Sequence, residues 1–179
     1  MSYQNKTEYR IEYKILPAAC YKIRKNCAGC GSKQIFVSTG NFRINANGNL
    51  LDVWLIYQCE KCKHTLNIPI YERVRTHKLS KEEYQAFLEN NLKLAHQYGK
   101  DKVIFSRNHL EIAWDFLECE LIPIKTEIFD IQKDFINVFI QNPFEIPVRE
   151  DKLLAEILSL SRSQVKKLLK EERITITIV

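Results

Sequence analysis

Two pairs of cysteines have the residue type and spacing that suit metal binding. Two residues separate Cys27 from Cys30 and Cys59 from Cys62, and twenty-eight residues lie between the pairs. A two-residue gap lets one tight turn aim both thiolates at a single ion. Because two such turns supply the four soft ligands of a closed site, the spacing predicts one structural zinc ion bound by Cys27, Cys30, Cys59 and Cys62.

The residues next to these pairs refine the prediction. Gly31 follows the first pair, where the turn needs a residue that tolerates positive φ and leaves amides to point at sulfur. The second pair is followed by Lys63 and lacks that glycine. His64 could replace a cysteine ligand, although we expect a non-ligand role. Cys20 and Cys119 lie outside the pattern, and we expect them to be small buried apolar residues.

Two other interpretations of the cysteines need conditions that the sequence does not favour. A disulfide framework suits secreted proteins, whereas we see no secretory segment and expect a cytoplasmic protein, where disulfides are disfavoured. A thioredoxin-like redox motif needs a helix that opens at Cys27. Gly31 and Ser32 are instead followed by residues typical of a strand.

The residues between the two cysteine pairs favour an antiparallel zinc ribbon. We expect strands at 35–37, 42–45 and 50–57, with Asn47-Gly48 as a hairpin turn. The last strand is apolar on both faces, with Leu51, Val53, Leu55 and Tyr57 on one and Leu50, Trp54 and Ile56 on the other. We therefore expect this strand to be buried on both sides and the ribbon to pack against the rest of the chain.

Charge is distributed unevenly over the 179 residues. The chain is 45% hydrophobic, enough for a substantial core in one or two domains, and no apolar run has the length of a membrane span. The net charge of +5 divides into +8 over residues 1–80 (thirteen basic, five acidic), −5 over 81–148 (seven, twelve) and +2 over 149–179 (seven, five). This separation indicates a basic face.

The basic surplus in the first segment has two interpretations. Six cations flank the cysteine pairs: Lys22, Arg24, Lys25, Lys33, Lys61 and Lys63. A zinc ion with four thiolates carries a charge of about −2, so two of these cations would offset it. The others, with Arg43, Arg73, Arg75 and Lys78, indicate either a polyanion partner such as RNA or a solvated charged surface.

The middle of the chain predicts a helix and then short strands. Ser80 and Glu83 form a capping-box pattern that begins a helix, and Gly99 ends it. Its apolar face holds Tyr84, Phe87, Leu88, Leu92 and Ala95, and Asn90 and Asn91 are expected to have no special role. Short strands or strand-like connectors are expected within 122–124, 128–131 and 138–140.

The last thirty residues predict two short helices joined by a tight turn. The first spans 151–159, and Ser161 and Gln164 form a capping box for the second. On the second helix the apolar residues Val165, Leu168 and Leu169 lie opposite a basic stripe. This stripe consists of Arg162, Lys166, Lys170 and Arg173. Helix N-terminal amides beside Arg162 would suit a phosphate.

The chain carries resemblances to two known families. Arg149 to Glu156, followed by Leu160 to Ile174, resembles the first two helices of the RNA-binding domain named after ribosomal small-subunit protein four. That domain also occurs in pseudouridine synthases and tyrosyl-tRNA synthetases, and its basic second helix contacts structured RNA. The resemblance implies that Arg162, Lys166, Lys170 and Arg173 contact RNA of the rRNA or tRNA class. This chain departs from the pattern at Glu172, where that family usually has glycine, and it lacks the family's further strand pair, so a helix pair kept for packing stays an alternative.

The second resemblance covers nearly the whole chain. Four segments are similar to a bacterial family catalogued as domain of unknown function 1062: Gly40-Asn41-Phe42-Arg43-Ile44-Asn45-Ala46-Asn47-Gly48, Leu51-Asp52-Val53-Trp54-Leu55-Ile56-Tyr57-Gln58-Cys59, Thr65-Leu66-Asn67 and Glu72-Arg73. The family implies no activity, so function has to be argued from sites.

Together these observations predict an α+β protein with three segments. They are a zinc-ribbon β module at 1–79, an α+β region at 80–148, and at 149–179 a helix-turn-helix-like pair ending in a short strand. The expected function is binding of structured RNA, because a basic helix face lies beside a capped turn. No enzyme activity is expected, because no glycine-rich phosphate loop, nucleophile elbow or His-Glu metal motif occurs. The alternative is a zinc-stabilised interaction or scaffold protein with a protein partner and no nucleic-acid role. No membrane association is expected.

Overall fold

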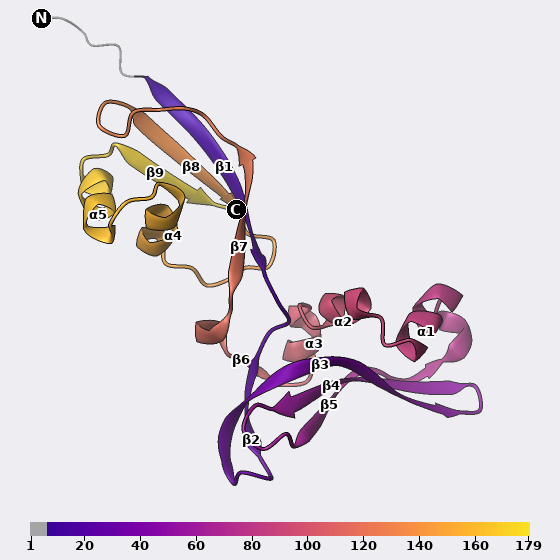
Figure 1. Ribbon diagram of the computed structural model, residues 1–179. Helices are drawn as coiled ribbons and strands as arrows, with labels where there is room; N and C mark the ends of the chain where they lie inside the picture. The colour runs from indigo at the N-terminus through magenta and orange to yellow at the C-terminus, as the bar shows by residue number, and fades with distance from the viewer. Residues whose placement is uncertain (1–6) are drawn as a thin grey trace, which may run out of the picture. The chain divides into compact units, whose positions relative to one another are not determined.

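Two β-sheets and five α-helices make up the computed structural model, which describes residues 7–179 (Figure 1). The chain divides into two compact units. The inserted unit is Pro17–Glu118, and the split unit combines the residues before Pro17 with Cys119–Val179. The boundaries at 79/80 and 148/149 expected from sequence therefore fall inside these units. No helix of the described residues is long and apolar enough to cross a membrane.

The split unit has a four-stranded sheet of order β7-β1-β8-β9. Its strands are β1 (Glu8–Pro17), β7 (Cys119–Lys125), β8 (Phe135–Gln141) and β9 (Ile174–Ile178). β8 pairs in parallel with both β1 and β9. Because parallel neighbours need a crossover, the chain passes through α4 (Glu150–Ile157) and α5 (Arg162–Lys170) between β8 and β9.

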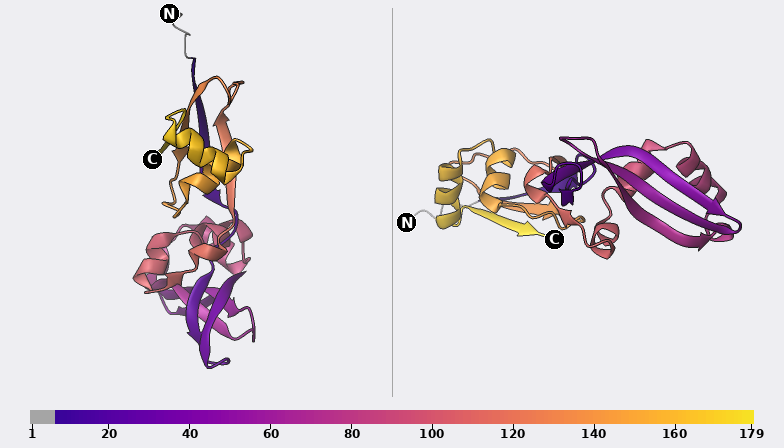
Figure 2. Two further views of the ribbon diagram at one scale, coloured as in Figure 1. Left: turned by 90° about the vertical axis from the view of Figure 1, so that its left-hand side faces the viewer. Right: turned by 90° about the horizontal axis from the view of Figure 1, so that it is seen from below.

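Alternation along these strands places the core of the split unit on one sheet face. The buried residues from the strands are Ile11, Ile15, Ile136, Val138, Ile140 and Ile174, and those from the helices are Leu153, Leu154 and Val165. Figure 2 shows α4 and α5 on the same side of this sheet. The predicted capping box of α5 is confirmed, since Ser161 and Gln164 bond each other's backbone N–H groups.

The inserted unit has an antiparallel five-stranded sheet of order β5-β4-β3-β2-β6. The strands are β2 (Ile23–Cys27), β3 (Ser32–Asn47), β4 (Leu50–Cys59), β5 (Thr65–Arg75) and β6 (Glu111–Ile112). One sheet face is covered by α1 (Lys81–Leu88), α2 (Leu92–Tyr98) and α3 (Lys102–Arg107), as Figure 1 shows. Two 3-10 turns, η1 (Thr76–Lys78) and η2 (Trp114–Phe116), complete the unit.

The strands between the cysteine pairs differ from the expected ones in two ways. The segments 35–37 and 42–45 belong to one long strand, β3, whose register with β4 shifts between Ser38 and Phe42. Asn47 pairs with Leu50, so the hairpin turn is Gly48-Asn49 and not Asn47-Gly48. Gly48 supplies the positive φ of 58° that such a turn requires.

Burial of β4 corrects the expectation of a strand buried on both sides. Leu51, Val53, Leu55 and Tyr57 are fully buried beneath the helices, as expected. Leu50, Trp54 and Ile56 point to the other face and are only half-buried. The apolar residues therefore alternate between a covered and an open face, because the three helices all pack on the same side of the sheet.

The single helix expected from Ser80 to Gly99 is wrong, because it is broken at Asn90 and Asn91. Asn90 has a φ of 52°, outside the helical region, and its Oδ1 accepts the N–H of Phe42 at 2.6 Å. Asn91 caps α2 by accepting the N–H of Leu94 at 3.1 Å. Both asparagines thus have structural roles that the sequence analysis did not assign.

Of the three short apolar runs in the middle region, two lie in strands. Residues 122–124 belong to β7 and 138–140 to β8. Residues 128–131 lie in the connection between β7 and β8 and form no strand, and Ile128 is 97% exposed. Asp130 bends this segment, since its carboxylate accepts the N–H of Gln132 at 3.0 Å and its own N–H bonds the Asp134 carboxylate at 2.7 Å. Such side-chain bonds compete with strand pairing.

Candidate metal centre

Four cysteine sulfurs converge at one end of the inserted sheet. The Sγ atoms of Cys27, Cys30, Cys59 and Cys62 all lie within 4.8 Å of one another. The Sγ separation is 3.4 Å between Cys27 and Cys62 and 3.9 Å between Cys30 and Cys59. A tetrahedral ion with metal–sulfur bonds of about 2.3 Å needs sulfurs about 3.8 Å apart. The cluster therefore has dimensions that can hold a metal ion.

The first cysteine of each pair is positioned by a strand, and the second lies in the turn that follows. Cys27 is the last residue of β2 and Cys59 the last of β4, and both are buried. In the first turn, the carbonyl of Cys27 accepts the N–H of Gly31 at 2.8 Å. In the second, the carbonyl of Cys59 accepts the N–H of Lys63 at 3.0 Å. The two turns therefore have the same hydrogen-bonding pattern.

The thiols of Cys27, Cys30 and Cys59 have different electrostatic surroundings. Backbone N–H groups, that of Cys62 first and then that of Lys61, lower the pKa of Cys59 to about 7. The hydrogen bond with the Cys62 sulfur, followed by burial, raises the pKa of Cys30 to about 12. Burial, followed by the bond to Cys62, also raises the pKa of Cys27. A bound cation would displace the remaining protons, because only thiolates coordinate metals.

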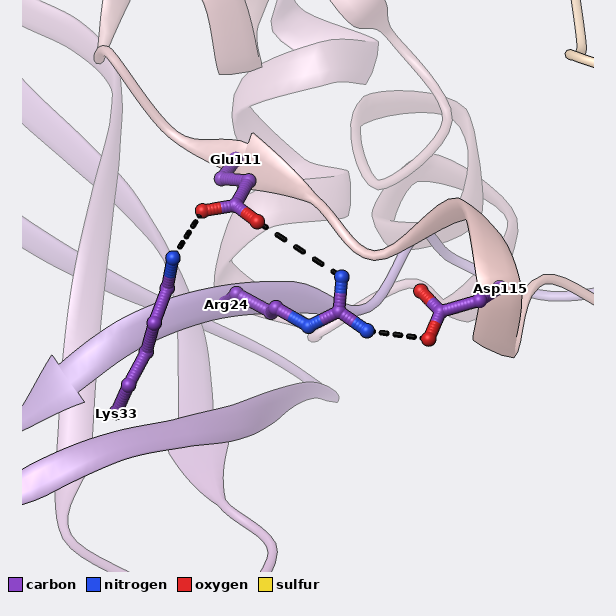
Figure 3. A network of polar contacts seen from close by, with 4 residues as sticks. All are labelled: Arg24, Lys33, Glu111 and Asp115. Carbon is purple, nitrogen blue, oxygen red and sulfur yellow. Dashed lines mark hydrogen bonds and ion pairs between the residues drawn. The ribbon is translucent and has the colours of Figure 1, made fainter.

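Half of the six cations that flank the cysteine pairs in sequence are held in ion pairs. Lys22 pairs with Glu60 at 2.9 Å. Figure 3 shows Glu111 between Lys33, at 2.5 Å, and Arg24, at 3.8 Å. Arg24 also pairs with Asp115 on η2. This network ties β2 and β3 to the segment of β6, so these cations serve the packing of the inserted unit.

His64, Cys20 and Cys119 are not among the grouped ligand atoms. The carbonyl of His64 accepts the N–H of Cys59 at 2.9 Å. Cys20 is half-buried, and its Sγ lies 3.8 Å from the carbonyl oxygen of Ala95. Cys119 on β7 is exposed, contrary to the expected buried position.

The basic stripe predicted at 162–173 divides into two kinds of residue. Lys166 and Lys170 are exposed on α5, and neither forms an ion pair with any residue of 7–179. Arg162 donates from Nε and Nη2 to one carboxylate oxygen of Asp151, at 3.0 and 2.7 Å. Arg173 is half-buried and donates to the carbonyls of Ile131 and Asp134 at 2.8 and 3.1 Å.

Asp151 was not singled out by the sequence analysis. It lies eleven residues before Arg162, and the two contact each other because α4 packs against α5. The Arg162 guanidinium, which donates to the carboxylate, and then the charge of nearby Arg149 lower the pKa of Asp151. The only sign of this ion pair near Asp151 in the sequence was the position of an acidic residue in the first turn of α4.

Fold and site together define an α+β protein with a cluster of four cysteines that can hold a metal ion. Residues 44–178 match the family described as protein of unknown function (DUF1062), and the chain belongs to this family. Comparisons with curated proteins and with solved structures give no match. The matched range includes Cys59 and Cys62 but begins after Cys27 and Cys30, so the cluster itself is a finding from the structure.

Proposed function

We propose that this protein is a non-enzymatic, zinc-stabilised protein of the zinc-ribbon type that binds structured RNA. Its four cysteines would hold one structural zinc ion, since four thiolates in tetrahedral reach suit zinc and leave no ligand position for water. The support for this part is the convergence of the four Sγ atoms within 4.8 Å from two turns of equivalent geometry.

The RNA contact is assigned to α5, whose two faces differ sharply. Val165 is buried, whereas Lys166 and Lys170 are exposed one helical turn apart. Arg162 and Arg173 are committed to contacts within the split unit, so the two lysines supply the phosphate contacts in this proposal. The resemblance of α4 and α5 to the first two helices of the domain named after ribosomal small-subunit protein four supports the same assignment.

The zinc part is tested by metal analysis of protein purified without oxygen. We expect one zinc per chain in the wild type and loss of zinc in Cys30→Ser, with Cys119→Ser as a control that keeps all four ligands. A metal-free wild type of native fold would contradict the zinc site.

The RNA part is tested by binding of tRNA across a salt series. Changing Lys166 and Lys170 together to Gln should weaken binding and reduce the slope of log K against log salt by about one to two units. The control is Lys125→Gln with Lys133→Gln, which removes the same charge from ion-paired cations of the split unit outside α5. Equal affinity and slope in wild type and K166Q/K170Q would eliminate α5 as the contact.

A protein-interaction role is the second candidate, and one observation favours it. β7 lies at the edge of the split unit's sheet, and its side chains Ile122 and Ile124 are 42% and 48% exposed. An exposed sheet edge can pair with an extended segment of another protein. If the wild type binds no tRNA at low salt, this alternative is preferred.

A further inference from the structure

A pocket in the inserted unit gathers basic side chains that the proposed function does not use. Its volume is about 490 Å³, and it lies at the end of β5, with η1 and α3 contributing to its wall. Four cations line it, Arg73, Arg75, Lys78 and Arg107, against one carboxylate, Glu72. Sequence alone marked three of these cations as part of a diffuse basic surplus. The fold gathers them in one place and adds Arg107.

These cations lack the compensation seen elsewhere in the inserted unit. Within residues 7–179, none of the four forms an ion pair, whereas Arg24 and Lys33 share Glu111. Four positive charges and one negative charge leave about +3 in the pocket. A concave site with charge of one sign concentrates ions of the opposite sign. The pocket is therefore suited to an anion.

The backbone of this wall has an unusual geometry. β4 pairs Leu51 with Val74 and Val53 with Tyr71, so Glu72 and Arg73 form a bulge opposite Asp52. The bulge is fixed by Asp52, whose Oδ1 accepts the N–H of Arg73 at 2.7 Å. Arg73 has a φ of 50°, which disfavours side chains with a Cβ. Bulges of this kind redirect side chains and are frequent beside functional sites.

Arg107 and Lys78 are positioned from the other side. Nη2 of Arg107 donates to the carbonyls of Pro69 and Ile70 at 3.1 and 2.7 Å, which fixes the guanidinium against β5. Three of its five N–H groups remain for a ligand. Lys78 ends η1, whose first residue, Thr76, donates to the carbonyl of Asn49 at 3.0 Å. The pocket therefore contains a guanidinium fixed by backbone carbonyls, that of Arg107, and an exposed ammonium group, that of Lys78.

We propose that this pocket binds the phosphate groups of a phosphorylated ligand. Arginine forks match phosphate oxygens in geometry and keep their charge at any physiological pH, and three of the four cations are arginines. The volume falls in the range of about 300 to 1,000 Å³ that is typical of small-molecule sites. The phosphates can belong to a free phosphorylated metabolite or to an RNA backbone. The pocket and α5 lie in different units, so this site stands whether or not α5 binds RNA.

The test uses two probes on the full-length, zinc-loaded protein at low salt. One is inorganic pyrophosphate, followed by calorimetry, and the other is a fluorescent single-stranded oligouridylate, followed by anisotropy. The pocket variant is Arg75→Gln with Lys78→Gln. The control is Lys81→Gln with Lys93→Gln, which removes the same charge from exposed cations on α1 and α2. All oligouridylate measurements carry K166Q/K170Q as background, so that α5 does not contribute.

We expect binding to weaken about tenfold or more in the pocket variant and to stay within about twofold in the control, because charge-assisted bonds are lost only in the former. Loss of pyrophosphate binding in the pocket variant would identify a free phosphorylated ligand as the source of the phosphate. Loss of oligouridylate binding alone in the pocket variant would identify an RNA backbone as that source. If neither probe binds the wild-type pocket, or if both variants weaken binding equally, the proposal is overturned. Circular dichroism and thermal unfolding verify that both variants fold.

Discussion

Gly31 and Lys63 occupy equivalent positions in the two cysteine turns, with φ angles of 66° and 63°. Each donates its N–H to the carbonyl of the first cysteine of its pair. Glycine adopts this conformation at no steric cost, whereas a residue with a Cβ pays about 1 to 2 kcal/mol. The second turn therefore carries strain that the first does not.

This relationship predicts opposite effects of two substitutions. Gly31→Ala should lower the unfolding free energy of the zinc-loaded protein by about 1 kcal/mol. A Cβ at Gly31 would meet no atom within 4 Å, so the loss would come from backbone strain alone. Lys63→Gly should leave stability unchanged or raise it, as relief of strain offsets the added chain entropy. Urea unfolding of both variants measures this, and an unchanged stability of Gly31→Ala would contradict it.

Removal of metal should act on the inserted unit, and the sequence provides a selective probe. Both tryptophans of the chain, Trp54 and Trp114, lie within Pro17–Glu118. Because structural metal binding is coupled to folding, a strong chelator should shift tryptophan emission to the red, and added zinc should restore it. Cys119→Ser should respond as the wild type does. An emission spectrum insensitive to chelator would show that the unit folds without metal.

A close approach between Cys20 and Gly99 predicts a coupled pair of substitutions. A Cβ added to Gly99 would lie 2.4 Å from the sulfur of Cys20. Gly99→Ala should therefore cost about 1 to 3 kcal/mol, as overpacking of a core does. The cost should fall only in part in a Cys20→Ala background, because the sulfur is gone but the Cβ of residue 20 stays 2.8 Å away. A double-mutant cycle by thermal unfolding measures the coupling, and strictly additive effects would rule out this contact as the cause.

The ion pair of Asp151 and Arg162 predicts a dependence of stability on pH. The pKa of Asp151 is lowered in the folded protein, mainly by the hydrogen bonds from Arg162. Its contribution is therefore complete above the ordinary aspartate pKa of about 3.9 and is lost as pH falls through the lower folded value. The stability difference between wild type and Asp151→Asn should be constant from about pH 7 to pH 5 and shrink in acid.

The measurement is urea unfolding at a series of pH values, with Glu172→Gln as control. Glu172 is an exposed carboxylate of the same unit and forms no ion pair among the described residues. A stability difference between wild type and Asp151→Asn that grows as the pH falls would contradict this prediction.

Features encoded by neighbouring residues could be predicted from the sequence. Both the Cys-x-x-Cys turns and the Ser161–Gln164 capping box depend on two residues that lie three positions apart in the chain. The break between α1 and α2 could not be predicted, because Asn90 leaves the helix to bond Phe42, which lies 48 residues away. Arg107 could not be predicted as a pocket residue either, because it lies 37 residues from Ile70, whose carbonyl it contacts on β5.

The two-unit organisation was also beyond sequence reasoning. Residues 8–14 of β1 pair with residues far along the chain, as Glu8 does with Phe135. Periodicity indicates that both segments are strands but carries no signal of the partner strand or of its direction. The segments expected at 1–79, 80–148 and 149–179 therefore follow chain order.

The insertion of one unit into the other has a consequence for biosynthesis. When β1 emerges from the ribosome, its partner β8 has not been made, and its apolar residues Ile11 and Ile15 have no sheet to join. The inserted unit is continuous and can fold first, and its ends then meet through the bond from the Ala18 N–H to the Glu118 carbonyl at 2.9 Å. Closing an unfolded loop of about 100 residues would cost about 4 kcal/mol of entropy. Prior folding of the insert would replace that long loop by a short one, so the order of synthesis favours folding of the unit with the four-cysteine cluster before the sheet of the split unit closes.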